Sequence, residues 1–236
     1  MNPNSLTTGW ATLWIEMLRR WVLNAGRRYH LDENPRRWSN SELRKVAPLF
    51  KGQVANVSGW RDEDKELGHY RDYFSAATEY AITNYWGSAA ANDGHPDSIP
   101  LDLTADLPAE FNRRFDAVFN HTVLEHIDDL EKAFGNLCVM TRDVVVLVVP
   151  YIQDIHFTEG LYGDCWRFTP HGLNFMFRRH GLEMVYLTAN DGVWYPIYLF
   201  AVASRSPERW KGVLPEGRTL THRVGHAMFH HPKEVW

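Results

Sequence analysis

Two polar residues, Asn120 and His121, end a dense run of apolar residues that begins at Phe115. Such a run is typical of a buried strand, so we expect both side chains at the carboxyl end of that strand. Imidazole changes its charge near neutral pH, and His121 is therefore our first candidate for a catalytic base. An equally supported alternative is that His121 hydrogen-bonds a bound ligand and does not act as a base. His156, in the polar stretch after the next strand, is the second candidate base.

The residues after His121 predict the elements that position it. Apolar residues recur at the helical interval from Thr122 to about Leu137, and residues 144–150 form a mainly β-branched run. A strand, a helix and a doubly buried strand in about 35 residues form one βαβ unit of a parallel sheet. Ligands of open α/β sheets bind outside the carboxyl ends of the strands. We therefore expect the functional site there.

The rest of the chain predicts an α/β domain with additions at both ends. Further strands are expected at residues 53–57, 79–85, 99–103, 182–187 and 197–203, and a helix from Thr169-Pro170 to Gly181. Residues 34–37 read as a loop, with a short helix starting at Asn40. The expected divisions are an N-terminal helical cap (1–48), the α/β domain (49–204) and an irregular C-terminal arm (205–236).

A Trp- and Arg-rich amphipathic helix is expected over residues 8–30. It could pack on the sheet, serve as a lid over the site or contact a second subunit in a homodimer. Trp and Arg also suit a membrane surface, which leaves an interfacial anchor open. The acidic net charge of the chain argues against that last role.

Composition narrows the class of protein. The 236 residues are 44% hydrophobic and carry a formal net charge of −4, which argues against a nucleic-acid or anionic-membrane binder. Two cysteines, Cys138 and Cys165, cannot form a disulfide framework. The first residues lack the pattern of a signal peptide, and no apolar run reaches the length of a membrane span. We expect a cytoplasmic protein.

Two segments resemble class I S-adenosylmethionine-dependent methyltransferases of the small-molecule and sugar type. Phe115-Asp116-Ala117-Val118, followed by Val123-Leu124-Glu125-His126-Ile127, is similar to one family segment, and residues 164–173 (DCWRFTPHGL) are similar to another. The resemblance covers about residues 50–204. It implies a Rossmann-like, seven-stranded, mostly parallel sheet with helices on both faces and an antiparallel last strand. It also implies S-adenosyl-L-methionine as cofactor and O-methylation of a small polar acceptor such as a sugar.

The cofactor loop departs from the family pattern. The residues that correspond to the family's cofactor-binding positions are Asn56, Ser58, Gly59, Asn84, Asp102, Leu103 and Asn120. Asn56 and Asn84 stand where the family has acids, and only Gly59 remains of the glycine-rich turn that lets a backbone approach the ligand. The alternative is a catalytically inactive protein that kept the fold as a binding or scaffold module.

Other polar residues allow two interpretations each. Glu125 could orient His121 or be structural, and we favour a structural role. Trp166 and Arg167 are expected to lock the loop after residue 150, although Trp166 could stack on a sugar. Residues 60–74 could be a solvated loop or could replace the glycine-rich turn and enclose the cofactor. His222, His226 and His230 are spaced by four, but Gly225 weakens a helix there, and we expect no metal site.

Overall fold

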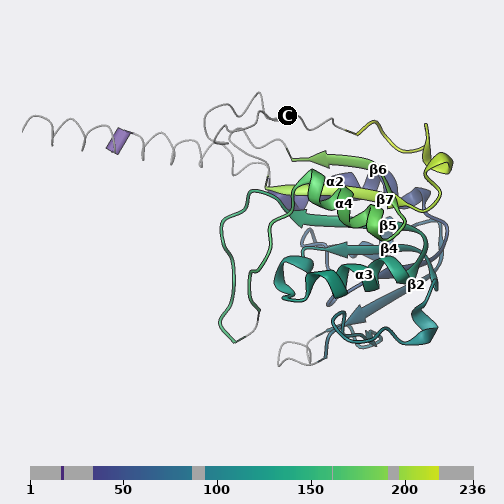
Figure 1. Ribbon diagram of the computed structural model, residues 1–236, viewed down its shortest axis with the longest axis horizontal. Coiled ribbons are helices and arrows are strands. Elements are labelled where there is room, and N and C mark those ends of the chain that lie inside the picture. Colours follow the sequence, from purple (N-terminus) through teal and green to yellow (C-terminus); the bar gives the residue numbers. More distant parts are fainter. Residues whose placement is uncertain (1–16, 19–33, 87–93, 161, 191–196, 218–236) are drawn as a thin grey trace, which may run out of the picture.

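The computed structural model describes residues 17–18, 34–86, 94–160, 162–190 and 197–217. Seven strands form one sheet in the order β3-β2-β1-β4-β5-β7-β6 (Figure 1). Their bounds are β1 Gly52–Asn56, β2 Ala77–Asn84, β3 Ile99–Pro100, β4 Phe115–His121, β5 Thr141–Pro150, β6 Glu183–Ala189 and β7 Tyr198–Ser204. β7 runs antiparallel to both neighbours, and the pairs formed by β1 to β5 are parallel. The predicted seven-stranded, mostly parallel sheet is confirmed.

Three α-helices cover the two faces of this sheet in the described part of the chain. α3 (Leu130–Met140) and α4 (Pro170–Arg179) pack on one face, and α2 (Pro35–Val46) packs on the other, behind the sheet in Figure 1. β5 is buried on both faces, with Val145 and Leu147 toward α3 and α4, and Val146 and Val148 toward α2. The apolar run that predicted a doubly buried strand is explained by this sandwich.

α2 begins five residues earlier than the sequence indicated. The predicted loop at residues 34–37 is wrong, because Asn34 caps the helix and Oδ1 of Asn34 accepts a hydrogen bond of 2.9 Å from the Arg36 amide. Pro35 occupies the first turn, where its missing N–H costs nothing. An Asn-Pro pair between charged residues reads equally well as a turn, and only the cap geometry distinguishes the two.

α3 begins later than predicted. Thr122 has a left-handed backbone with φ of 49°, which is incompatible with a helix starting there. A single 3₁₀ turn, Leu124–His126, follows it, and Asp129 then caps α3 by accepting a bond from the Lys132 amide. The apolar spacing from residue 123 onward comes from a turn and a helix that share one buried face.

The connection between β1 and β2 contains no α-helix. Residues 57–76 run as turns with one short 3₁₀ helix, Tyr70–Tyr73. Tyr70, Tyr73 and Phe74 are buried against α2 and β4, in the layer that a crossover helix would otherwise fill. This loop is therefore part of the core.

Several expectations concern residues outside the described part of the chain. Of the predicted helix over residues 8–30, only Met17 and Leu18 are described, and both are helical. His222, His226 and His230 lie outside the described residues. No helix among the described residues is long and apolar enough to cross a membrane.

Candidate functional site

The carboxyl ends of the parallel strands lie along one edge of the sheet. β1 is flanked by β2 on one side and β4 on the other, so the strand order changes direction at β1 and β4. This is the position where open α/β sheets bind their ligands. Asn56, Asn84 and His121 are the last residues of β1, β2 and β4, and Asn120 precedes His121. The structure thus brings these four predicted residues to one edge.

Asn56 shapes the turn after β1 from inside. Its side chain is buried, and its Nδ2 donates to Oδ1 of Asp62 over 2.7 Å. A Cβ added to Gly59 would lie 2.5 Å from this Nδ2, far closer than atoms allow. Position 59 is therefore a glycine because the Asn56 side chain occupies the space that a Cβ would need. This close contact lies within the loop and involves no ligand.

Asn84 holds the same turn from the end of β2. Its Oδ1 accepts a bond from the Trp60 amide over 2.7 Å, and its Nδ2 donates to the Trp60 carbonyl over 2.9 Å. Ser58 and Trp60 both have left-handed backbones, with φ of 56° and 50°. Because both polar atoms of Asn84 already serve Trp60, a contact with a cofactor would have to use the remaining lone pair or proton.

The loop after this turn is organised around buried carboxylates. Oδ1 of Asp62 also accepts from the hydroxyl of Tyr80 over 2.7 Å, and its Oδ2 accepts from the Arg71 amide over 3.0 Å. Asp64 accepts from the Gly68 amide over 2.9 Å and from the hydroxyl of Tyr73 over 2.6 Å. These bonds hold the loop in one conformation, so residues 60–74 are not a solvated loop.

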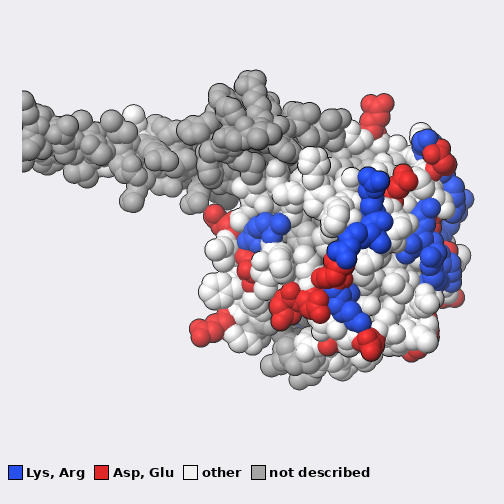
Figure 2. Space-filling view, viewed as in Figure 1, with Lys and Arg blue, Asp and Glu red and all other residues white. Residues whose placement is uncertain are grey.

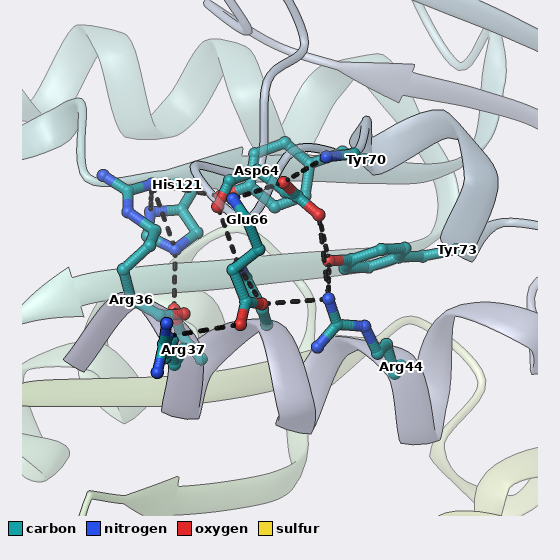
Figure 3. A network of polar contacts seen from close by, with 11 residues as sticks. Arg36, Arg37, Arg44, Asp64, Glu66, Tyr70, Tyr73 and His121 are labelled. Atoms are coloured by element: carbon teal, nitrogen blue, oxygen red, sulfur yellow. Dashed lines mark hydrogen bonds and ion pairs between the residues drawn. The ribbon is translucent and has the colours of Figure 1, made fainter. Parts of the chain in front are cut away.

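α2 closes this network from the other side (Figure 3). Arg44 lies 3.7 Å from Asp64 and 2.9 Å from Glu66, and Nδ2 of Asn40 donates to Glu66 over 3.0 Å. Hydrogen bonds from Tyr73 and two backbone amides, together with the charge of Arg44, outweigh burial and lower the pKa of Asp64. The loop and α2 therefore form one rigid wall beside the carboxyl edge.

Asp102 and Leu103 follow β3 at the same edge. Oδ1 of Asp102 accepts from the amide and hydroxyl of Thr104, over 2.8 and 2.7 Å. Its Oδ2 makes no hydrogen bond with any residue that the structure describes. The Leu103 side chain is buried in the core, and its carbonyl accepts from Asn136 over 2.9 Å. Asp102 is thus the member of this pair with a free oxygen for a ligand.

Asn120 and Glu125 present buried acceptors that lack partners. Nδ2 of Asn120 donates to the Val57 carbonyl over 2.9 Å, while its Oδ1 has no partner among the described residues. Both carboxyl oxygens of Glu125 are also buried without a hydrogen-bond partner there, and Nε2 of His126 lies 3.8 Å from Oε1. Burial raises the pKa of Glu125 to about 8, so this carboxyl is mainly protonated at neutral pH. Glu125 makes no hydrogen bond to His121.

His121 is held by α2 instead. Nη1 of Arg36 lies 2.8 Å from Nδ1 of His121, and Oγ of Ser39 lies 2.8 Å from Nε2. The Ser39 hydroxyl lies 2.9 Å from the Arg36 carbonyl and donates its proton there. Burial, and secondarily the positive charge of Arg36, lower the pKa of His121 well below its usual range. His121 is therefore neutral at working pH.

His156 lies in a different cluster. Its ring centroid is 5.0 Å from that of His126 and 5.5 Å from that of Tyr162, while His121 packs near Tyr70 and Tyr198. The structure therefore does not bring the two candidate bases together. His126 is fixed by a 2.6 Å bond from Nδ1 to the Gly163 carbonyl.

The loop after β5 is locked as the sequence predicted. Nε1 of Trp166 donates to the Ile127 carbonyl over 2.8 Å, and Arg167 pairs with Asp164 over 2.5 Å. The Arg167 hydrogen bonds lower the pKa of Asp164 to about 2. Asp164 also accepts from the His156 amide over 2.6 Å, so this ion pair fixes the backbone at His156.

Sequence reasoning missed Arg36 and Ser39. Both lie in the stretch interpreted as a loop and the start of a late helix, yet the structure places them on the first two turns of α2 beside His121. The Asn34-Pro35 pair, an N-cap followed by proline at the first helical position, was the signal that could have found them.

Charged side chains elsewhere on the described chain form pairs with one another. No group of three or more His, Cys, Asp or Glu residues among the described residues is arranged to hold a metal ion. On the face that carries α3 and α4, basic and acidic side chains are interspersed (Figure 2), and examples pair as Lys132–Asp106 and Arg179–Glu131. A groove of about 610 Å³ lies at the opposite, amino-terminal ends of β1, β4 and β5, where its carboxylates are already paired with arginines.

Comparisons with known proteins identify the fold. No protein-family model and no curated protein matches the sequence. An S-adenosylmethionine-dependent methyltransferase from Mesorhizobium loti superimposes with a TM-score of 0.52 and 12% identity, covering 69% of this chain and 95% of its own. One from Clostridium acetobutylicum gives 0.52 and 9%, covering 80% and 98%.

A third solved structure contains bound ligands. The 1,6-didemethyltoxoflavin-N1-methyltransferase of Burkholderia thailandensis, solved with 1,6-didemethyltoxoflavin and S-adenosylhomocysteine, gives a TM-score of 0.51 and 16% identity, covering 86% of this chain and 90% of its own. Identities this low establish architecture and leave the chemistry to the residues of each site. The chain has the α/β fold of the S-adenosylmethionine-dependent methyltransferases.

Proposed function

We propose that this protein is an S-adenosylmethionine-dependent methyltransferase whose site lies at the carboxyl edge of the sheet. The observation that carries the proposal is the strand order with an antiparallel β7, shared with solved methyltransferases, together with polar side chains at the ends of β1, β2 and β4. The fold alone does not determine activity, so the argument rests on what these residues offer a ligand.

The residues at this edge suit the proposed cofactor in two respects. Oδ1 of Asn120 is a buried acceptor that needs a donor, and Asp102 keeps one carboxylate oxygen for an amine or hydroxyl. Ser58 and Gly59 would contribute backbone in the turn after β1, although Gly59 already accommodates Asn56. S-adenosyl-L-methionine, when bound, supplies an electrophilic methyl group. The chain's part is then to align an acceptor and exclude water.

The acceptor we propose is a small polar molecule, with a sugar hydroxyl as the first class to examine. Support comes from the resemblance of residues 164–173 to sugar methyltransferases and from the ordered loop that carries His156. His156 is exposed and lies beside the ring of Tyr162, whereas His121 is buried with its ring nitrogens next to Arg36 and Ser39. His156 is accordingly our leading candidate base.

Cofactor binding is the first test. The full chain should be titrated with S-adenosylmethionine and S-adenosylhomocysteine in a thermal-shift assay, with ATP as a control adenosine compound. A ligand at 100 times its dissociation constant stabilises by about 2.7 kcal/mol, which raises the melting temperature by roughly 5–11 °C for a chain of this size. Acceptor screening with a labelled methyl donor and a panel of sugars follows a positive result.

The competing function is a non-catalytic binding or scaffold protein. The use of Asn84 and Gly59 to build the β1 turn favours it, because the family's ligand-facing positions are here occupied by internal contacts. No thermal shift with either compound at millimolar concentration would support this function and exclude the enzyme.

A further inference from the structure

The Arg36 guanidinium lies at the carboxyl end of β4. Among the described residues, its hydrogen bonds go to neutral groups, namely the hydroxyl of Tyr70 over 3.1 Å, Nδ1 of His121 over 2.8 Å and the hydroxyl of Thr122 over 3.2 Å. No carboxylate among the described residues forms an ion pair with it. By contrast, Arg37 and Arg44 of the same helix both pair with Glu66.

The bonds leave part of the guanidinium available. Three of its five N–H donors are used, two on Nη1 and one on Nη2. The remaining two are Nε–H and one N–H of Nη2. An arginine holds a carboxylate or phosphate in bidentate fashion through two such parallel donors, which makes a strong, charge-assisted contact. The side chain is half-buried, so it is both positioned and accessible to a ligand.

The surroundings fix this side chain in place. Thr122, which accepts from Nη2, holds a left-handed backbone with φ of 49° that a β-branched residue rarely adopts. Strained backbone of this kind persists where the surrounding structure demands it, and it concentrates at functional sites. Arg36, His121 and Tyr70 come together from α2, β4 and the β1–β2 loop (Figure 3). Three separate elements therefore converge on one cation that has no ion-pair partner in the described part of the chain.

We propose that Arg36 is the binding residue for an anionic group, a carboxylate or phosphate, of a ligand bound at the carboxyl end of β4. Two sources fit this chemistry. One is the α-carboxylate of the proposed cofactor, which rests on the proposed function. The other is an acidic substituent of the acceptor, which does not depend on how the cofactor binds.

Binding at Arg36 has a consequence for His121. The ionisable groups in contact with that ring are Arg36 from α2, Tyr70 from the β1–β2 loop and Tyr198 from β7. Glu125 interacts electrostatically with both Arg36 and Tyr198. An anion would neutralise Arg36 and so remove one of the two causes of the low pKa of His121. The imidazole resonances of His121 therefore report on occupancy of the site.

The experiment compares the full chain with two variants. Arg36→Lys keeps the positive charge and loses the paired N–H donors of the guanidinium. Arg37→Lys, on the same helix, is the matched control. Calorimetry measures S-adenosylhomocysteine against 5′-methylthioadenosine, which lacks the amino-acid end. Separately, malonate and inorganic phosphate are titrated while the His121 ring is followed by NMR. Circular dichroism and a melting curve check that each variant is folded.

If the cofactor's carboxylate is the ligand, Arg36→Lys should weaken S-adenosylhomocysteine roughly 10- to 100-fold and leave 5′-methylthioadenosine unchanged. If the acceptor is the source, S-adenosylhomocysteine is unaffected, and the malonate or phosphate response of His121 is lost in Arg36→Lys and kept in Arg37→Lys. Identical behaviour of all three proteins in both arms would overturn the proposal. Failure of both adenosine compounds to bind would reject the proposed enzyme, while the anion titration still tests Arg36.

Discussion

Nη1 of Arg36 donates to Nδ1 of His121 over 2.8 Å, while Nε2 of the same ring faces the Ser39 hydroxyl at 2.8 Å. Because Ser39 gives its own proton to the Arg36 carbonyl, its oxygen accepts from Nε2. The ring is therefore neutral, with its proton on Nε2 and its basic nitrogen occupied by an arginine. His121, which we predicted as a base, is therefore held in position as a hydrogen-bonding partner of Arg36 and Ser39.

This arrangement predicts how His121 responds to pH. A histidine whose pKa is lower in the folded than in the unfolded state takes up a proton on unfolding, so the protein loses stability as pH falls below about 6.5. The ¹⁵N shifts of His121 should keep the neutral Nε2–H pattern at pH 6. His121→Gln should flatten the acid side of the stability profile, with His69→Gln controlling for loss of an exposed imidazole. A His121 ring that titrates near pH 6.5 would contradict the assigned bonding.

Glu125 predicts the opposite pH dependence. Burial raises the pKa of this carboxyl from 4.5 to about 8, so the folded state holds a proton that the unfolded state releases. Stability should therefore be highest below pH 4.5 as far as this group is concerned and should fall as pH rises toward 8. The full difference corresponds to about 5 kcal/mol.

Glu125→Gln removes that ionisation and should raise the free energy of unfolding at pH 8.5 relative to the unaltered chain. Glu110→Gln, at an exposed site, is the control. Urea denaturation at pH 6 and pH 8.5 measures the effect. Parallel stability profiles for the unaltered chain and Glu125→Gln would show that Glu125 does not change its protonation on unfolding.

Asn84→Asp should weaken the turn after β1. An aspartate retains the acceptor for the Trp60 amide but places a carboxylate oxygen against the Trp60 carbonyl, which now receives no donor. The cost of the unpaired groups is about 1–3 kcal/mol. Chemical denaturation should show this loss at pH 7, and Asn112→Asp, at an exposed position, should not. Equal stability of Asn84→Asp and the unaltered chain would mean that the clamp on Trp60 contributes nothing.

Gly59→Ala tests whether Gly59 serves the loop or a ligand. The new Cβ would approach Nδ2 of Asn56 to 2.5 Å and push that amide away from Asp62, so we expect a loss of about 1–3 kcal/mol without any ligand present. Gly163→Ala is the matched control, because its Cβ would meet only Cys165 Sγ at an ordinary 3.6 Å. If Gly59→Ala folds as stably as the control and loses only cofactor affinity, the glycine serves the ligand.

The sequence by itself determined the sheet and the central βαβ unit. Strand β5 was readable because residues 144–149 are apolar without a break, and burial on both faces of a parallel strand demands that composition. The N-cap at Thr169 and the helix after it could also be predicted, because capping and helical periodicity depend on residues that are neighbours in the sequence. Local rules act within a few residues, and these elements obey them.

Only the tertiary structure decided which polar groups meet. Arg36 and His121 are 85 positions apart, and their contact exists because α2 packs across the end of β4. Asn84 reaches Trp60 because β2 lies beside β1 in the strand order. The chain pattern marks each of these residues as polar and near a strand end, but the partner of each is set by sheet order, register and helix docking. The sequence marks His121 as a candidate base, and only the folded structure shows that hydrogen-bonding partners hold it.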